Sequence, residues 1–193
     1  MTELKNKVAV AIFEKVGEEQ FIKDMLNTFD CYHICTLKEI YKHIKLPKRS
    51  TSGSAGYDFY SPIYFELKPG KTITIPTGIR CSIEDGFYLG ILPRSSYGFK
   101  YKTTLDNTMG IIDSDYYYAN NEGHIMIKIT NHSKNHDVLS YVKNVVLNQK
   151  KEDGILTVNQ NDRFCQGIFQ KYYITHDDNT NSIRTGGFGS TGE

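Results

Sequence analysis

The residues with the clearest chemical potential stand at the end of the chain. Arg184 precedes a glycine-rich run around one aromatic side chain, Gly186-Gly187-Phe188-Gly189-Ser190-Thr191-Gly192. Glycine adopts positive φ angles readily, so successive N–H groups can turn toward an anion, and an arginine adds a charged fork. Phe188 offers a flat apolar face for stacking on a base. We therefore interpret 184–193 as a lid that becomes ordered over a nucleotide, rather than as a solubilising Gly/Ser tail.

Four further clusters place charged and polar side chains at turns or strand ends. They span 52–58, 93–98, 110–116 and 163–166. The third is the sharpest, because Asp113 ends a short apolar run, where it could accept a proton from water. In the second, Arg94, Ser95 and Ser96 could cradle a phosphate. Taken singly, each of the other clusters is equally typical of an ordinary turn.

The elements that must position these clusters are mostly short strands. An opening strand is expected over 7–13, and apolar residues at three- and four-residue spacing predict a pair of amphipathic helices within 18–44, broken near 30–35. From Ser54 onward, β-branched and aromatic segments alternate with turns. They predict strands at 57–65, 72–76, 78–83, 88–92, 111–112, 124–130 and 164–174. Many short strands indicate an all-β sandwich or jelly-roll-like barrel.

Length and composition predict one domain over 1–193. Hydrophobic residues make up 39% and charged residues 23% of the chain, which is typical of globular proteins. Lys+Arg number 23 against 22 Asp+Glu, so no basic field indicates nucleic-acid binding. No apolar run approaches the length of a membrane span, and the start of the chain is too polar for a secretory signal. We expect a cytoplasmic protein, or one in the host cytoplasm if the gene is viral.

Four scattered cysteines indicate a reducing compartment. Cys31 and Cys35 flank a histidine, but a structural zinc site closes with four ligands and no second pair stands at a usual distance. We interpret the cysteines as isolated buried residues and expect no zinc.

In sequence order, the five clusters resemble the five motifs of the trimeric dUTP diphosphatase (dUTPase) family, over most of residues 47–193. The resemblance implies a jelly-roll subunit in a homotrimer with three active sites at subunit boundaries, and a C-terminal arm exchanged between subunits. The implied reaction is hydrolysis of dUTP to dUMP and pyrophosphate with Mg²⁺ on the triphosphate. That reaction keeps uracil out of DNA and supplies dUMP.

The resemblance also implies roles for single residues. Asp113 matches the general base that activates water for attack on the α-phosphorus, and Tyr116 matches the aromatic residue under the deoxyribose. Asn107 matches an amide contacting the nucleoside, and backbone groups around 107–127 would read uracil. The phosphate chain would be held by Arg94, Ser95, Ser96, Gln166 and Arg163, its terminal phosphate by Arg184, and the lid by Gly187, Phe188 and Ser190. Asp58 would act near the metal through water, because Mg²⁺ gives up its waters reluctantly.

Three segments depart from the family outline, namely 18–44, 117–122 and 133–154, and Arg184 stands one position closer to the glycines than usual. A helical insertion with an apolar stripe is expected to be surface decoration that closes a core edge or the trimer rim. Within 133–154, helix and hairpin cannot be separated. Some phage-encoded relatives carry inserts near the fourth motif that contact regulatory proteins, so a protein partner for 133–154 is a minority alternative.

Two other functions are compatible with the same clusters. One is a dUTP-responsive regulatory protein that acts through its insertions. The other is a dCTP deaminase, which shares the fold and needs a glutamate acting on the base; Glu122 is the candidate here.

Overall fold

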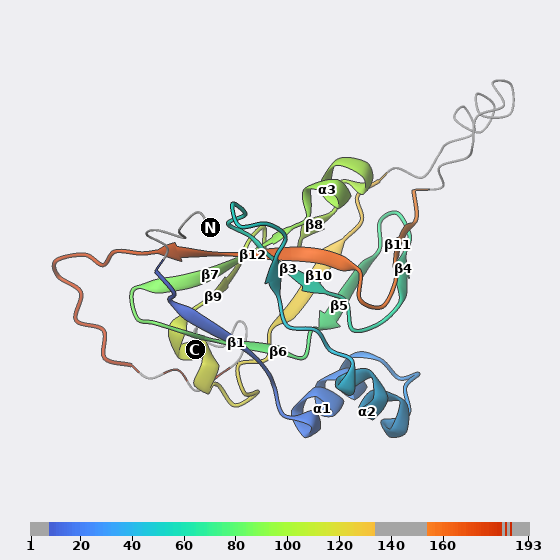
Figure 1. Ribbon diagram of the computed structural model, residues 1–193, viewed down its shortest axis with the longest axis horizontal. Helices are drawn as coiled ribbons and strands as arrows, with labels where there is room; N and C mark the ends of the chain where they lie inside the picture. The colour runs from blue at the N-terminus through green and yellow to red at the C-terminus, as the bar shows by residue number, and fades with distance from the viewer. Residues whose placement is uncertain (1–7, 134–153, 183, 185, 187–193) are drawn as a thin grey trace, which may run out of the picture.

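Antiparallel strands are the main regular elements of the computed structural model, which describes residues 8–133, 154–182, 184 and 186 (Figure 1). The strands are β1 (Ala11–Lys15), β2 (Lys48–Arg49), β3 (Tyr57–Tyr60), β4 (Phe65–Leu67), β5 (Thr72–Pro76), β6 (Ile79–Ile83), β7 (Phe87–Pro93), β8 (Thr104–Leu105), β9 (Gly110–Ile112), β10 (Met126–Thr130), β11 (Leu156–Val158) and β12 (Arg163–Lys171). This is the all-β, jelly-roll-like architecture expected from the sequence.

Four sheets organise these strands. The largest has the order β2-β3-β12-β7-β9, and β12 lies at its centre. A second sheet has the order β5-β10-β8, and β1-β6 and β11-β4 form two-stranded ribbons. Alternating strand residues face a shared core that includes Phe59, Ile75, Leu89 and Phe164. The turns between the strands bring the functional clusters to the ends of the largest sheet.

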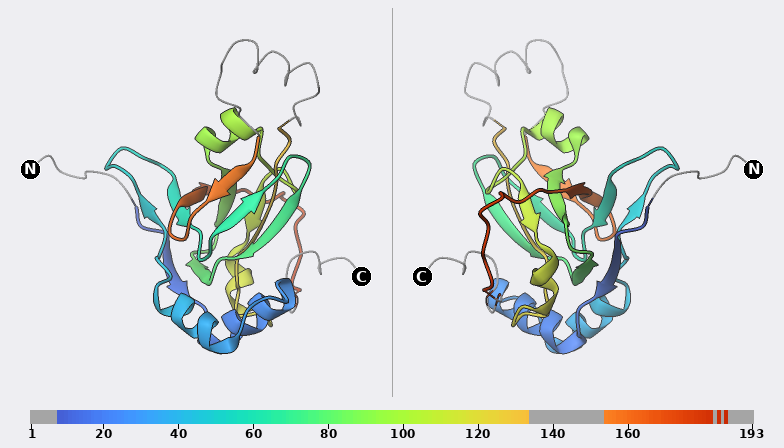
Figure 2. Two further views of the ribbon diagram at one scale, coloured as in Figure 1. Left: turned by 90° about the vertical axis from the view of Figure 1, so that its right-hand side faces the viewer. Right: turned by 90° about the vertical axis from the view of Figure 1, so that its left-hand side faces the viewer.

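The predicted helix pair is present at one end of the molecule (Figure 2). α1 (Glu18–Thr28) and α2 (Ile34–Lys42) pack against each other, and α1 also contacts β5. Phe21, Met25 and Leu37 are wholly buried, so the apolar stripe of this insertion is part of the main core. None of the helices in the described ranges is long and apolar enough to cross a membrane.

Several boundaries differ from the sequence expectations. The first strand lies at Ala11–Lys15, later than expected, and the expected strand 57–65 is divided into β3 and β4. The division falls at Ser61 and Pro62, where proline has no N–H for a ladder and the Ser61 hydroxyl bonds the Ile63 carbonyl instead. The short strands β2, β8 and β11 were not predicted, because two or three residues give no periodic signal. The insertion 133–154 lies almost entirely outside the described residues.

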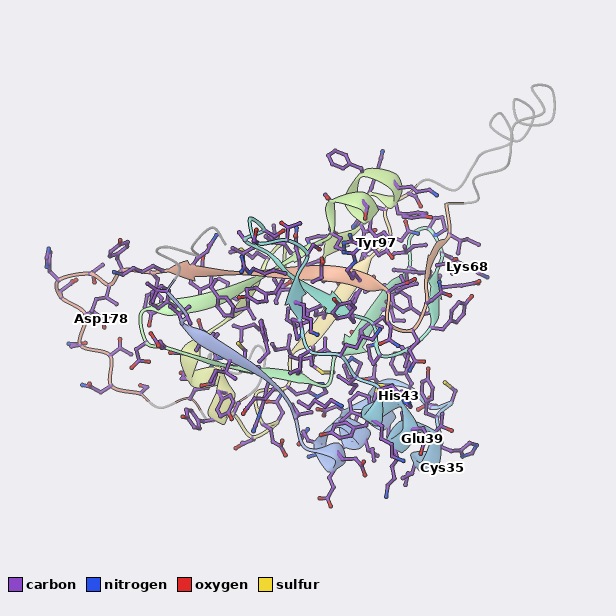
Figure 3. All side chains as sticks on the ribbon, in the orientation of Figure 1. Cys35, Glu39, His43, Lys68, Tyr97 and Asp178 are labelled. Carbon is purple, nitrogen blue, oxygen red and sulfur yellow. The ribbon has the colours of Figure 1, made fainter. Side chains whose placement is uncertain are left out.

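The cysteine interpretation was half wrong. Cys81 and Cys165 are buried, and burial raises the pKa of the Cys81 thiol to about 12, so neither is a poised nucleophile. Cys31 and Cys35 are exposed, because the break between the helices and the first turn of α2 face solvent (Figure 3). Across the described ranges, no group of three or more His, Cys, Asp or Glu side chains could hold a metal ion.

Candidate active site

One cluster of charged side chains lies where β3, β12 and β7 meet. We call Asp58, Arg94 and Arg163 the arginine cluster. Asp58 is buried in β3, and its Oδ2 accepts hydrogen bonds from Ser50 Oγ at 2.7 Å and Arg163 Nη1 at 3.2 Å. Its Oδ1 lies 3.6 Å from Arg94 Nε. Two guanidinium groups against one carboxylate leave a net positive charge, which suits an anionic ligand.

The neighbouring phosphate candidates stand beside this cluster in the sheet. Gln166 pairs with Asp58 across β3 and β12, and its Nε2 donates to the Pro93 carbonyl at 3.5 Å. Ser95 and Ser96 are exposed and begin a short helix, α3 (Ser95–Tyr101), where only a turn was expected. Arg94 precedes this helix, and its Nη1 donates to the Arg163 carbonyl at 3.2 Å. The structure thus brings together the expected residues of the first, second and fourth motifs.

A pocket of about 380 Å³ lies elsewhere, between β9 and β10. We call it the hairpin pocket. Its aliphatic walls are Ile91, Leu105, Met126 and Ile127, and its remaining lining residues are Thr74, Asp106, Asn107, Gly110, Asn121 and Lys128. The volume is in the range of small-molecule sites. Asn107, which the sequence marked as a nucleoside contact, lies in this pocket, while Asn121 was not predicted.

Asp113 and Tyr116 follow the pocket-lining strand β9 and are reached by the chain's own C-terminal segment. Arg184 Nη2 lies 3.1 Å from Asp113 Oδ2, and Arg184 Nε lies 3.6 Å from Asp115 Oδ1. The Arg184 guanidinium also stands 5.5 Å from the centre of the buried Tyr116 ring. Arg184 therefore contacts the predicted base and aromatic platform, whereas its expected contact was the terminal phosphate.

Burial and two charged neighbours shift the pKa of the Asp113 carboxyl. Burial raises the pKa of the Asp113 carboxyl above its ordinary value, the Arg184 guanidinium opposes that shift, and the Asp115 charge adds to it. The side chain is about half exposed, at 47%, so a water molecule can reach it. A half-exposed carboxylate with a raised pKa and a neighbouring cation fits the requirements of a general base.

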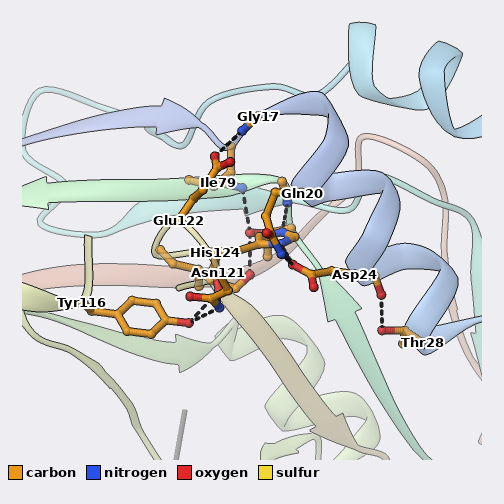
Figure 4. A network of polar contacts seen from close by, with 12 residues as sticks. Gly17, Gln20, Asp24, Thr28, Ile79, Tyr116, Asn121, Glu122 and His124 are labelled. Atoms are coloured by element: carbon orange, nitrogen blue, oxygen red, sulfur yellow. Dashed lines mark hydrogen bonds and ion pairs between the residues drawn. The ribbon is translucent and has the colours of Figure 1, made fainter. Parts of the chain in front are cut away.

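A polar network behind Tyr116 was missed by sequence reasoning (Figure 4). The Tyr116 hydroxyl donates to the His124 carbonyl at 2.8 Å and accepts from Asn121 Nδ2 at 2.8 Å. His124 contacts Asp24 in α1, one hundred residues earlier in the chain. The only sequence signals were a histidine opening a buried strand and an acid at the edge of a helical apolar stripe.

The arginine cluster and Asp113 lie at opposite ends of β7. Ile112 pairs with Leu89, and Ser114 Oγ bonds Asp85 Oδ1 at 3.2 Å in the turn before β7. Arg94 follows the other end of the strand, six residues beyond Tyr88, which is about 20 Å at the usual rise of a strand. One chain thus carries two separate half-sites. Gly187, Phe188 and Ser190 lie outside the described residues.

Comparison with known proteins gives one consistent result. A family model described as dUTPase matches residues 42–139. The deoxyuridine 5'-triphosphate nucleotidohydrolase of Lactococcus lactis is 34% identical over 152 residues, which cover 77% of this chain and 89% of that protein. The dUTPase of Streptococcus mutans aligns with a TM-score of 0.55 and 27% identity, over 84% of this chain and 97% of that chain.

A second solved structure adds to the likeness of fold. It is a mutant dUTPase of phage phi11 of S. aureus, described with a structural Mg(II) ion, and it aligns with a TM-score of 0.53 and 20% identity, over 72% of this chain and 90% of that chain. By the family model and the relative from L. lactis, which the chain covers over most of its length, this chain belongs to the dUTPase family.

Proposed function

We propose that the protein hydrolyses dUTP to dUMP and pyrophosphate, with Asp113 as the general base. The observation that carries the proposal is the position of Asp113. It stands three residues beyond Gly110 of the hairpin pocket, half exposed, and beside a compensating guanidinium. These are the conditions under which a carboxylate can hold and deprotonate a water next to a bound nucleotide.

The chemical step follows from that placement. Asp113 accepts a proton from water as the water oxygen forms a bond to the α-phosphorus. The bond between the α-phosphorus and the bridging oxygen breaks, and pyrophosphate leaves with that electron pair. Arg184 favours the ionised form of Asp113 in the free protein, because a cation within about 4 Å lowers the pKa of an acid.

The lining of the hairpin pocket supports a preference for uracil among the bases. Ile91, Met126 and Ile127 form its sides, and for a base held against them a ring methyl group would have to displace packed side chains. Asn107 and Asn121 supply polar atoms, and a base with a mismatched donor pattern would leave such groups unpaired, which is the stronger form of discrimination. The pocket therefore suits uracil better than thymine or cytosine.

We infer that complete sites form only between copies of the chain, as in a homotrimer. The base must be within hydrogen-bond reach of the attacking water, yet the arginine cluster lies about 20 Å away along β7. A second copy that docks its arginine cluster against Asp113 closes this gap. Residues 172–182 are exposed throughout, with Tyr173 at 85%, and in the single chain they loop out from β12 and turn back, so that Arg184 reaches the chain's own Asp113 (Figure 1).

The residues present fit a Mg²⁺ ion carried by the substrate. Both oxygens of Asp58 already contact Ser50, Arg94 and Arg163, so this carboxylate is suited to contact through water rather than to direct ligation. When bound, Mg²⁺ would neutralise phosphate charge and hold the phosphate chain in line for attack. Arg94 and Arg163 would hold the remaining phosphate oxygens.

The alternatives have less support from the contacts. Glu122, the candidate base-acting residue of a deaminase, accepts a hydrogen bond from Gly17 N at 2.6 Å and is thereby tied to the start of α1. A regulatory role through 133–154 stays a prediction, because that segment lies almost wholly outside the described residues. Cytoplasmic location and independence of nucleic acid also remain predictions.

Product release from a panel of nucleotides tests the proposal. Purified protein with Mg²⁺ is incubated with dUTP, dTTP, dCTP and UTP, and pyrophosphate is measured. Release from dUTP alone is expected. Ammonia release from dCTP would instead support the deaminase, and dUTP binding without pyrophosphate release would support the regulatory protein.

A further inference from the structure

His124 is wholly buried, and both of its ring nitrogens are bonded (Figure 4). The backbone N–H of Gly78 donates to Nε2 at 2.7 Å. Since a backbone N–H can only donate, Nε2 must be an acceptor and the ring proton must sit on Nδ1. Nδ1 then donates to Asp24 Oδ2 at 2.6 Å. The contacts therefore fix both the tautomer and the orientation of the ring.

Asp24 is held in turn by its own helix. Gln20 Nε2 donates to Asp24 Oδ2 at 2.8 Å, one turn earlier in α1. Burial raises the pKa of the Asp24 carboxyl, but the hydrogen bonds from His124 and Gln20, together with nearby positive charge such as Lys23, outweigh burial, so that the pKa lies below its ordinary value. Asp24 is thus held as a carboxylate that orients His124.

The backbone carbonyl of His124 contacts two of the proposed substrate-binding residues. Its carbonyl oxygen accepts from Tyr116 Oη at 2.8 Å and from Asn121 Nδ2 at 3.4 Å. Asn121 lines the hairpin pocket, and Tyr116 lies against Arg184 beside Asp113. The bonds of the ring to Gly78 and Asp24 hold the His124 backbone in place, so a displacement of that backbone would move the anchor of both residues.

A second contact joins the start of α1 to the segment that precedes β10. Glu122 Oε2 accepts from Gly17 N at 2.6 Å, at the start of α1. The turn at Gly78 is also shaped by the insertion, because a Cβ there would lie 2.3 Å from Ile44 Cδ1. The helical insertion and the segment 117–124 are therefore packed as one support.

We propose that Asp24 and His124 are positioning residues that set the geometry of Tyr116 and Asn121, and hence the affinity and sugar selectivity of the site. The inference rests on the proposed function, with Asn121 in the base pocket and with Tyr116, as the family resemblance implies, under the deoxyribose. It gives the 18–44 insertion a role beyond surface decoration. Removing the acceptor at Asp24 leaves a buried N–H without its partner, and the ring then shifts to recover a hydrogen bond.

The test is a set of variants assayed for KM, kcat and the preference for dUTP over UTP. For Asp24→Ala we expect KM for dUTP to rise about tenfold and the dUTP/UTP ratio of kcat/KM to fall by a similar factor, with kcat within about twofold. A merely structural role would reduce the active fraction, and so the apparent kcat, while leaving KM and selectivity unchanged.

Two companion variants define the result. Asp24→Asn keeps a carbonyl oxygen that accepts from His124 and should restore KM to within about twofold of the parent protein. Glu39→Ala removes an exposed carboxylate of the same insertion, which pairs with the exposed Lys42, and should change nothing. An unchanged KM and ratio in folded Asp24→Ala, or equal defects in the Ala and Asn variants, would overturn the inference.

A milder variant and a binding assay keep the two proposals apart. If Asp24→Ala does not fold, Gln20→Ala removes only the donor that orients Asp24, and a KM rise of about threefold is expected; no rise would overturn the inference. The Kd of a non-hydrolysable dUTP analogue is measured for every variant. A parent protein that binds the analogue without hydrolysing dUTP would end the proposed hydrolysis, and the Kd ratios would still decide the role of Asp24.

Discussion

The two half-sites of this chain are built in different ways. The arginine cluster is a partly exposed charge cluster on neighbouring strands of one sheet, where cross-strand pairing alone aligns Asp58 with Gln166. Tyr116 is buried, and the support for it and for Asn121 of the hairpin pocket comes from α1, about one hundred residues earlier in the chain. The first half-site therefore tolerates changes outside its strands, whereas the second depends on the packing of the insertion.

The two half-sites therefore meet different requirements: one binds phosphate charge, and the other recognises the base and the sugar. Charge complementarity to a triphosphate is a coarse requirement that a few arginines on a sheet can meet. Distinguishing one base and one sugar requires side chains held to within a fraction of an ångström, and buried hydrogen-bonded networks supply that rigidity. We expect variants in the two half-sites to fail in different ways.

The largest effect is expected at Asp113, where the two half-sites would meet. Asp113→Asn keeps the size of the side chain but removes the base, so kcat should fall about 10²- to 10⁴-fold while the Kd of a non-hydrolysable analogue changes little. Steady-state kinetics and calorimetry measure both. Asp115→Asn is the matched control, since Asp115 also contacts Arg184, and it should retain near-normal kcat. Equal losses in both variants would remove Asp113 from its role.

The second-largest effect is expected on stability, at the turn where the helical insertion packs against Gly78. Gly78 has a φ of 73°, and a methyl group there would meet Ile44 and Phe21 of the insertion. Gly78→Ala should lower the free energy of unfolding by about 2–4 kcal/mol, from left-handed strain plus overpacking. Gly70→Ala is the control, because Gly70 has a φ of 74° and open space around it, so that only the strain remains. Denaturant midpoints that are equal for the two variants would show that the insertion does not press on this turn.

The smallest effect is a shift in pH dependence. The Arg184 cation lowers the pKa of Asp113, opposing the rise due to burial. Arg184→Gln removes that cation, so the pKa of Asp113 should rise further. Because the base works in its ionised form, activity is lost as pH falls through this pKa, and the acid limb of kcat/KM should move to higher pH. An acid limb that stays in place or moves to lower pH would show that Arg184 does not lower the pKa of Asp113.

The sequence predicted the first half-site better than the second. Asp58, Arg94 and Gln166 of the first half-site stand in short local clusters, as Asp113 of the second does, and the order of these clusters along the chain is itself the signal. The all-β class and the two helices followed from periodicity. The contact between Asp24 and His124 could not be predicted, because nothing local links two residues so far apart in the chain. The helix α3 was missed for a related reason, since its seven residues have no apolar repeat.

The exposed cysteines show the same limit. Cys31 and Cys35 were expected to be buried because cysteine usually is, yet the break between two helices faces solvent. Residue type gives an average preference, whereas burial depends on which face of an insertion packs against the domain. That face is fixed by packing between elements, such as the contact of α1 with β5, which the local pattern does not identify.

Complementation between two inactive chains tests the central claim, that the half-sites at opposite ends of β7 combine between copies. Asp113→Asn and Arg94→Ala are purified separately and also co-expressed, and dUTP hydrolysis is measured for each preparation. If sites are shared, about a quarter of those in an equal mixture unite two intact halves, so the co-expressed protein should recover activity that neither variant has alone. Co-expressed protein no more active than the separate variants would contradict the account.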